Sequence, residues 1–268
     1  MTTTSAPAVL SRAGLVRTIA AGVCALTVAA AGAALGAWLG WLGAPALPSD
    51  AAVLALVQPA APDARFTTVA RHEAPFAYEH TPGPMTWLIG DDDYNAGGVV
   101  LTAGVSPQTL RAGLAAQGWH TSDDPDYEGI AASKGQWSVW AYPAEVDGSP
   151  TDSRVAKVLA VDFQRAEPGL VTPLTAAGFL LGLAVGWLLG RRAQRHVLAG
   201  ALLLLLPGTV ITIGDLIAAR FLPADVTPPA LWGDYLFFGI RALTTAGLLA
   251  LAVAVVLGLR RGPRPARD

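Results

Sequence analysis

The sequence predicts a multi-pass α-helical membrane protein: four transmembrane helices, with an extracytoplasmic α+β domain inserted between the first and the second. Three observations predict this fold class. Of the 268 residues, 53% are hydrophobic and 14% are charged, whereas soluble domains carry about 25% charged residues. The apolar residues are gathered in four long blocks, and basic residues flank these blocks on one side. A long acidic segment with alternating apolar residues separates the first two blocks.

Each apolar block is long enough to cross a bilayer, which takes about 20 residues in a helix. The four expected spans are 18–42, 171–189, 197–219 and 235–259. The first could be read as a cleaved signal peptide, but its apolar run exceeds the roughly 7–15 residues typical of one, so we interpret it as a retained anchor. Lipidation of Cys24 is disfavoured because the branched Val23 precedes it.

The distribution of charge predicts the orientation, because cytoplasmic loops carry an excess of Lys and Arg. Three basic segments, 1–17, 190–196 and 260–268, must share one side if there are four spans. The other side receives the loop 220–234 and the segment 43–169, where acidic residues outnumber basic ones about two to one. We therefore expect a cell-membrane protein with both termini in the cytoplasm and residues 43–169 outside. An acidic outer domain repels phosphates, so nucleic acid is not an expected partner.

Two spans carry glycines at four-residue spacing, which places them on one face of each helix and lets another backbone approach closely. These glycine-zipper residues are Gly32, Gly36 and Gly40 in the first span and Gly178, Gly182, Gly186 and Gly190 in the second. We expect the two spans to pack against each other. The same faces could instead join two copies of the chain, and the spacing does not distinguish these alternatives.

Two ionisable residues, Asp215 and Arg241, lie well inside apolar sequence. Each is about six residues, or roughly 9 Å, from the outer end of its span, so a charge pair between consecutive antiparallel helices is plausible. A charge in hydrocarbon costs at least about 2.5 kcal/mol, and such residues pair, reach a wet cavity or mark an ion path. We favour a structural pair, with a transport role as the alternative.

The segment between the first two spans predicts a small α+β domain, an antiparallel sheet with one main helix on one face. Ser106-Pro107 is a helix start signal and Gly118 a stop signal, so 107–117 is the expected main helix, with a shorter one at 50–57. The expected strands are 65–72, 75–81, 85–89, 99–103, 137–142 and 155–163. Four tryptophans, Trp87, Trp119, Trp137 and Trp140, are expected in the core, with a glycan pocket as the alternative.

A run of acidic residues offers oxygen ligands at alternate positions: Asp91, Asp93 and Asn95. This is how a calcium loop begins, but Ala96 stands where such a loop needs Gly and Thr102 where it needs Glu. We regard a solvated turn as the better interpretation and calcium as the alternative.

The chain carries no nucleophile motif, metal-binding spacing or phosphate-binding glycine loop. We therefore expect no cofactor and a non-enzymatic protein, with an extracytoplasmic enzyme as a weaker alternative. The leading hypothesis is a sensory or accessory membrane protein whose outer domain binds a ligand or a partner. Besides the lipid bilayer, the expected partners are another membrane or exported protein, or a second copy of the chain.

Overall fold

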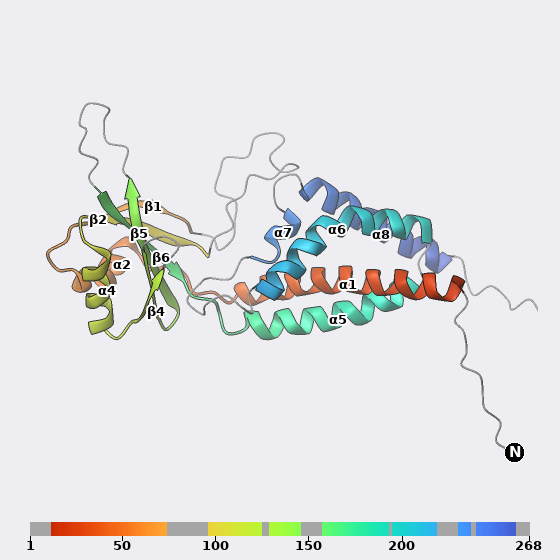
Figure 1. Ribbon diagram of the computed structural model, residues 1–268, viewed down its shortest axis with the longest axis horizontal. Coiled ribbons are helices and arrows are strands. Elements are labelled where there is room, and N and C mark those ends of the chain that lie inside the picture. Colours follow the sequence, from red (N-terminus) through yellow and green to blue (C-terminus); the bar gives the residue numbers. More distant parts are fainter. Residues whose placement is uncertain are drawn as a thin grey trace, which may run out of the picture.

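The computed structural model describes residues 12–73, 96–124, 129–145, 157–192, 195–218, 230–236 and 240–260. A sheet domain and a helical bundle lie end to end along the long axis (Figure 1). Within the described chain, four helices are long and apolar enough to cross a membrane. They are α1 (Arg12–Trp41), α5 (Val171–Arg192), α6 (Arg195–Ala218) and α8 (Ile240–Arg260). The predicted architecture of four long apolar helices with an inserted α+β domain is confirmed.

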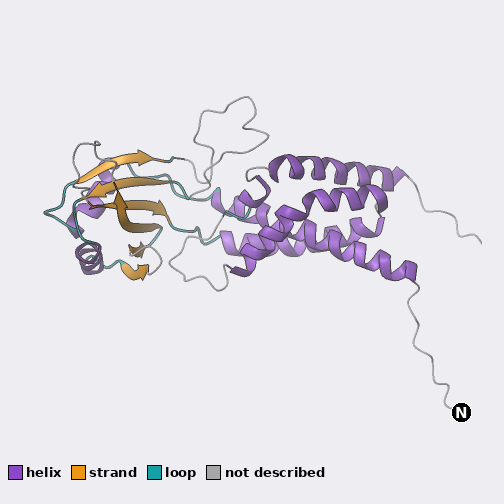
Figure 2. Ribbon diagram, turned by 45° about the horizontal axis from the view of Figure 1, so that its top comes forward, coloured by secondary structure: helices purple, strands orange, loops and turns teal. Residues whose placement is uncertain are grey.

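The sheet domain lies between α1 and α5 in the chain and contains a six-stranded antiparallel sheet (Figure 2). Its strands are β1 (Phe66–Arg71), β2 (Gly98–Ala103), β3 (His120–Asp124), β4 (Gly129–Lys134), β5 (Trp137–Glu145) and β6 (Lys157–Arg165). The spatial order is β1-β2-β6-β5-β4-β3, so β1 and β3 form the edges among the described strands. The main helix, α4 (Pro107–Ala116), connects β2 to β3.

One face of the sheet is covered by three helical segments: α2 (Asp50–Val57), η1 (Gln58–Ala60) and α4. Their apolar side chains pack on the inward residues of the central strands, and Val53, Val57, Leu110, Leu114 and Phe163 are among the most buried. The helix α4 begins as its sequence predicts, because the Ser106 hydroxyl accepts a hydrogen bond from the Thr109 amide. Gly118, with a φ of 80°, follows its end.

The strands differ from the sequence prediction in two ways. The expected strands 75–81 and 85–89 lie outside the described residues. β3 and β4 were not predicted, because their residues give little strand signal. β3 reads HTSDD, which is polar because this strand is an edge, and β4 reads GIAASK, in which small residues predominate.

The bundle is organised around α1, which packs against α5 and α6, while α6 packs against α8. The expected fourth span began at residue 235, whereas the structure has a short helix α7 (Gly233–Leu236) before α8. The segment at α7 packs on the half of α1 that is nearer to the sheet domain, where Trp232 and Tyr235 belong to a cluster that includes Ala34 and Trp41. Residues 237–239, between the two helices, lie outside the described chain.

Candidate functional site

The base of the sheet domain contains a buried arginine. Arg165 is the last residue of β6, and its side chain is 3% exposed. Its Nε donates to the carbonyl oxygen of Pro45 at 2.6 Å, its Nη1 to that of Ala96 at 3.1 Å and its Nη2 to that of Glu73 at 2.8 Å. One guanidinium group therefore satisfies three backbone carbonyl oxygens from three separate segments.

Two of the four segments of this site lead directly into long apolar helices. Pro45 follows α1, and Arg165 itself is six residues before the start of α5 at Val171, while Glu73 follows β1 and Ala96 precedes β2. The guanidinium thus ties the exit of α1 to the strand that leads into α5. We call Arg165 and its three carbonyl partners the arginine junction.

The charge of Arg165 is held without an ion pair, since the ion pairs of the described residues do not include it. Burial lowers the pKa of Arg165, the carboxylate of Glu73 acts in the opposite direction, and the positive charge of Arg71 lowers the pKa further. Burying a charge is expensive unless hydrogen bonds replace its hydration. The three carbonyl oxygens replace the hydration of the guanidinium group. Moving any one of them away from Arg165 would therefore lower the stability of the folded protein.

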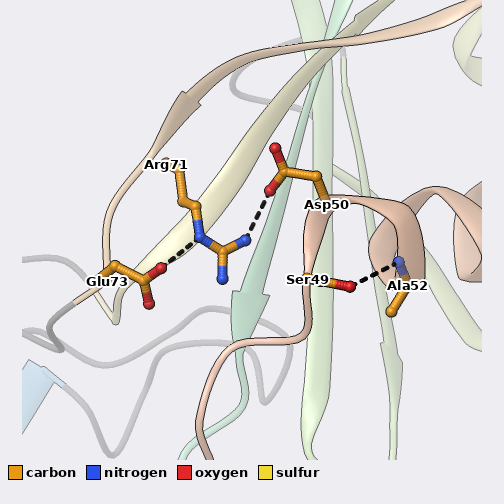
Figure 3. Close-up of polar contacts among 5 residues, drawn as sticks. All are labelled: Ser49, Asp50, Ala52, Arg71 and Glu73. Atoms are coloured by element: carbon orange, nitrogen blue, oxygen red, sulfur yellow. Dashed lines mark hydrogen bonds and ion pairs between the residues drawn. The ribbon is translucent and has the colours of Figure 1, made fainter.

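A second arginine, Arg71, contacts the side chain of Glu73, whose carbonyl belongs to the arginine junction. Figure 3 shows how Arg71 joins α2 to β1. Arg71, the last residue of β1, places its Nη1 2.8 Å from Oδ1 of Asp50 and its Nε 2.5 Å from Oε1 of Glu73. The hydrogen bond to Glu73 raises the pKa of Arg71, against the lowering effect of burial, and Asp50 adds to the rise. Asp50 is the first residue of α2, whose N-cap Ser49 accepts from the Ala52 amide at 3.3 Å. Arg71 therefore fixes the start of α2 against the end of β1.

Beyond the arginine junction, α1 and α5 pack backbone to backbone. A Cβ atom added to any of the seven glycine-zipper residues would lie closer than 3.0 Å to an atom of the opposite helix. Gly32 and Gly178 contact each other directly, Gly40 contacts Val171 at the end nearer to the sheet domain, and Gly190 contacts Ala21 at the other end. The two helices are antiparallel, and their contact extends along most of α5.

Both glycine faces are therefore occupied within a single chain. This geometry corresponds to the first of the two arrangements that the spacing allows, in which the two spans pack on each other. Self-association through the same face would require α1 and α5 to separate. Other glycines behave differently: a Cβ on Gly22 or Gly200 would meet nothing within 4 Å.

The two intramembrane charges lie on consecutive long helices. Asp215 is near the end of α6 and Arg241 is near the start of α8, and both are half-buried. The ion pairs of the described residues do not include one between them, and the structural pair stays a prediction. α6 and α8 also contact each other through apolar atoms, for example where Leu205 packs on Gly247.

The remaining expected site residues are distributed as follows. Asp91, Asp93 and Asn95 lie outside the described residues, as does Trp87. In the part that is described, no group of three or more His, Cys, Asp and Glu side chains could hold a metal ion.

The described tryptophans of the sheet domain are divided between its two faces. Trp119 and Trp137 are in the core, where each ring contacts Phe163 at centroid distances of 6.4 and 5.3 Å. Trp140 differs from the prediction, because it lies on the face opposite to the core.

Sequence reasoning missed the arginine junction, although a signal was present. In β6, Leu159, Val161 and Phe163 alternate on the buried face, and the same period of two places Arg165 on that face. A charged residue in phase with a buried stripe indicates a buried hydrogen-bonding role. Its partners are backbone atoms 69 to 120 residues away along the chain, which no local pattern identifies.

No protein-family model, curated protein or solved structure matches the chain. Function is therefore inferred from the arginine junction, the glycine interface and the surface of the sheet domain.

Proposed function

We propose that this protein is a non-enzymatic binding protein of the cell membrane, with its sheet domain outside the cytoplasm. In this proposal the sheet domain engages a ligand or a partner, and α1 and α5 connect it firmly to the bilayer. The observation that carries the proposal is the arginine junction. A domain that needs only an anchor can be attached to it through a flexible linker. Here the buried guanidinium group of Arg165, at the end of β6, donates a hydrogen bond to the segment that follows α1.

The placement of the helix ends supports the orientation. The start of α1, the end of α5, the start of α6 and the end of α8 all lie at the end of the bundle that faces away from the sheet domain (Figure 1). In the sequence, the three basic segments adjoin these helix ends. The positive-inside rule assigns that end to the cytoplasm, and the acidic sheet domain is then outside.

The glycine interface supports a relay in addition to an anchor. Gly40 of α1 contacts Val171 of α5. Gly40 is only five residues before Pro45, and Val171 is only six residues after Arg165. A ligand that shifts the base of the sheet would therefore displace the outer ends of α1 and α5 together. Because closely packed interfaces tend to be bistable, such a displacement could be transmitted to the cytoplasmic ends of the two helices.

Cysteine labelling tests the orientation. In a C24S background, G104C places a thiol at an exposed position of the sheet domain where an added Cβ meets nothing within 4 Å. The matched control is H196C, at the exposed start of α6. We expect a membrane-impermeant maleimide to label G104C but not H196C in intact cells, and both after lysis. The reverse pattern would contradict the proposed orientation.

Site-specific photocrosslinking tests the binding role. A photoreactive residue at Val69, which is 62% exposed on β1, is compared with the same residue at Leu181, which is 68% exposed on α5. We expect Val69 to capture a molecule that Leu181 does not, identified by mass spectrometry. If both positions capture the same set of molecules, the sheet domain has no specific partner at this edge and the binding role loses its support.

A further inference from the structure

An apolar groove runs between α1 and α5 in the half of the bundle that faces away from the sheet domain, where the two helices lie side by side (Figure 1). Its volume is about 490 Å³, within the range of small-molecule sites, which is about 300–1,000 Å³. We call it the α1–α5 groove. The residues that line it include Gly22 and Leu26 of α1 and Leu180, Leu183, Ala184 and Trp187 of α5.

The α1–α5 groove opens on the side of α1 that faces away from α6. Cys24 packs in one cluster with Leu198 of α6. Gly22 and Leu26 are two residues from Cys24 in either direction, which is a rotation of about 200° around the helix. Leu26 is 47% exposed and Trp187 is 39% exposed, and a Cβ added to Gly22 would meet nothing within 4 Å. In a bilayer this opening faces lipid.

An arginine lies at one end of the α1–α5 groove. Arg191 continues the line of groove residues on α5, because it follows Trp187 by four residues and Ala184 by seven. It is exposed and is the last residue of its apolar span, at the position of the membrane surface. From Leu180 to Arg191 the helix rises roughly 16 Å, which is close to half of a hydrocarbon core about 30 Å thick. The groove and its arginine therefore match the depth of one leaflet.

The charge at this end of the bundle favours an anion. The three basic segments, 1–17, 190–196 and 260–268, contain nine arginines and a single acidic residue, Asp268. A guanidinium group binds a phosphate through two parallel hydrogen bonds. It has five N–H donors, so Arg191 can bind a phosphate in addition to any contact within the chain. Basic residues beside a groove between membrane helices are typical of sites for anionic lipid headgroups.

The same charges disfavour a second copy of the chain as the occupant of the α1–α5 groove. Two copies that cross a membrane in the same direction would bring their arginine-rich ends together. Those ends offer one carboxylate, Asp268, against nine arginines in each copy, and like charges repel. A phospholipid with an anionic headgroup has the opposite charge at the membrane surface and an acyl chain for the apolar walls.

We propose that the α1–α5 groove binds one anionic phospholipid, from the leaflet at the end of the bundle that faces away from the sheet domain. An acyl chain lies along Leu180, Leu183 and Trp187, in the space that Gly22 leaves open, and Arg191 binds the phosphate. This inference goes beyond the proposed function, because it assigns a ligand to the helical bundle. It holds for either orientation of the protein in the cell.

Native mass spectrometry of the full-length protein in detergent micelles tests the lipid site. The protein is titrated with phosphatidylglycerol, which is anionic, and separately with phosphatidylcholine, which has no net charge. R191Q removes the charge at the end of the groove, whereas G22L and A184L fill the groove from α1 and from the exposed Ala184 of α5.

Each kind of change has a matched control. R260Q removes one arginine at the same end of the bundle, on α8. G200L adds a leucine to α6, at a glycine where an added Cβ also meets nothing within 4 Å. Thermal unfolding of every variant reports whether it is folded, and the two filling variants enter the groove from different helices, so one folded variant is enough.

We expect the wild type, R260Q and G200L to bind one phosphatidylglycerol about tenfold more tightly than phosphatidylcholine. R191Q should bind phosphatidylglycerol about tenfold more weakly than the wild type, because charge-assisted hydrogen bonds are lost. A folded G22L or A184L variant should also lose the tight binding, although Arg191 is unchanged.

Three results would overturn the inference. The first is equal affinity of the wild type for the two lipids, which means that no anionic headgroup is recognised. The second is tight binding that folded filling variants retain, which means that the phosphate is bound without the groove. The third is a dimeric wild type that G22L converts to a monomer, which means that the groove joins two copies of the chain.

Discussion

Replacing Arg165 with methionine removes the guanidinium group while keeping a long apolar side chain. Three carbonyl oxygens, of Pro45, Glu73 and Ala96, lose their donor. A hydrogen bond from a charged donor contributes about 1.5–3 kcal/mol, so the gross loss is about 4.5–9 kcal/mol. R165M also avoids burying a charge, which returns several kcal/mol. We expect a net loss of about 3 kcal/mol at the base of the sheet.

Hydrogen exchange of the full-length protein in nanodiscs measures this loss locally. A net change of 3 kcal/mol lowers the protection of amides that open with the junction by roughly 150-fold, since about 1.4 kcal/mol corresponds to a factor of ten. The affected peptides are the start of β2 at Gly98 and the end of β6. The matched control is R111M, which removes an exposed arginine of α4 that pairs with Asp123 of β3. We expect R111M to leave β2 and β6 unchanged.

The result that would refute the reasoning is an R165M variant whose β2 and β6 amides exchange within about threefold of the wild type. Such a result means that the carbonyl oxygens find other donors and that the arginine junction does not hold the domain to α1. A loss of protection throughout the sheet, with the same factor in α4, would instead mean that Arg165 stabilises the whole domain and not the junction in particular.

The R165K variant adds a pH dependence with a defined sign. Burial lowers the pKa of the native Arg165, and it would lower that of a lysine at this position below its unfolded value of about 10.4. Between the folded and unfolded pKa values the unfolded chain binds more protons, so stability rises with pH. We therefore expect R165K to be more stable at pH 10 than at pH 7 relative to the wild type. An arginine stays charged over this range.

Three further substitutions address the bundle and the second arginine. G178A places a Cβ against the Gly32 carbonyl and should lower the stability of the α1–α5 pair by about 1–3 kcal/mol. The control is G22A, where the added Cβ meets nothing within 4 Å and stability should not change. Denaturation in mixed micelles compares the two variants. R71A removes two partly exposed ion pairs, with Asp50 and with Glu73, and should lower stability by about 0.5–1 kcal/mol. Faster hydrogen exchange of the α2 amides measures the effect, which added salt should weaken. D215N should leave the unfolding temperature in detergent equal or raised, because Asp215 forms no ion pair within the described chain; a large decrease would reveal a partner.

The helices were predictable because a bilayer imposes a length and a composition that few other structures share. Strands with clear alternation were predictable for a similar reason, as in β6, where Leu159, Val161 and Phe163 face the core. β3 and β4 were not predictable. β3 is an edge strand and needs no apolar residues, and β4 contains small alanines, which give little strand signal. Tertiary pairing decides these strands, and no local propensity reports it.

The candidate site also contains parts that the sequence predicts and parts that it does not. Glycine spacing identified the interface of α1 with α5, since a helix face is defined by local periodicity. The partners of Arg165 were beyond reach, because they are carbonyl groups that every residue possesses. The face occupied by Trp140 depends on the register of β5 against β6, and a shift of one residue would have placed this ring in the core.

The arginine junction and the glycine interface both constrain α1 and α5, but they constrain different movements. Backbone contact at Gly32 and Gly178 fixes the distance between α1 and α5. The hydrogen bonds of Arg165 are directional, so they fix the height of the α1 exit against the end of β6. A rigid pair of helices whose relative height is set by one guanidinium group is suited to convert a rearrangement at the base of the sheet into an axial shift. A flexible tether would have neither feature, which is why we propose a binding role for the sheet domain that the helices can sense.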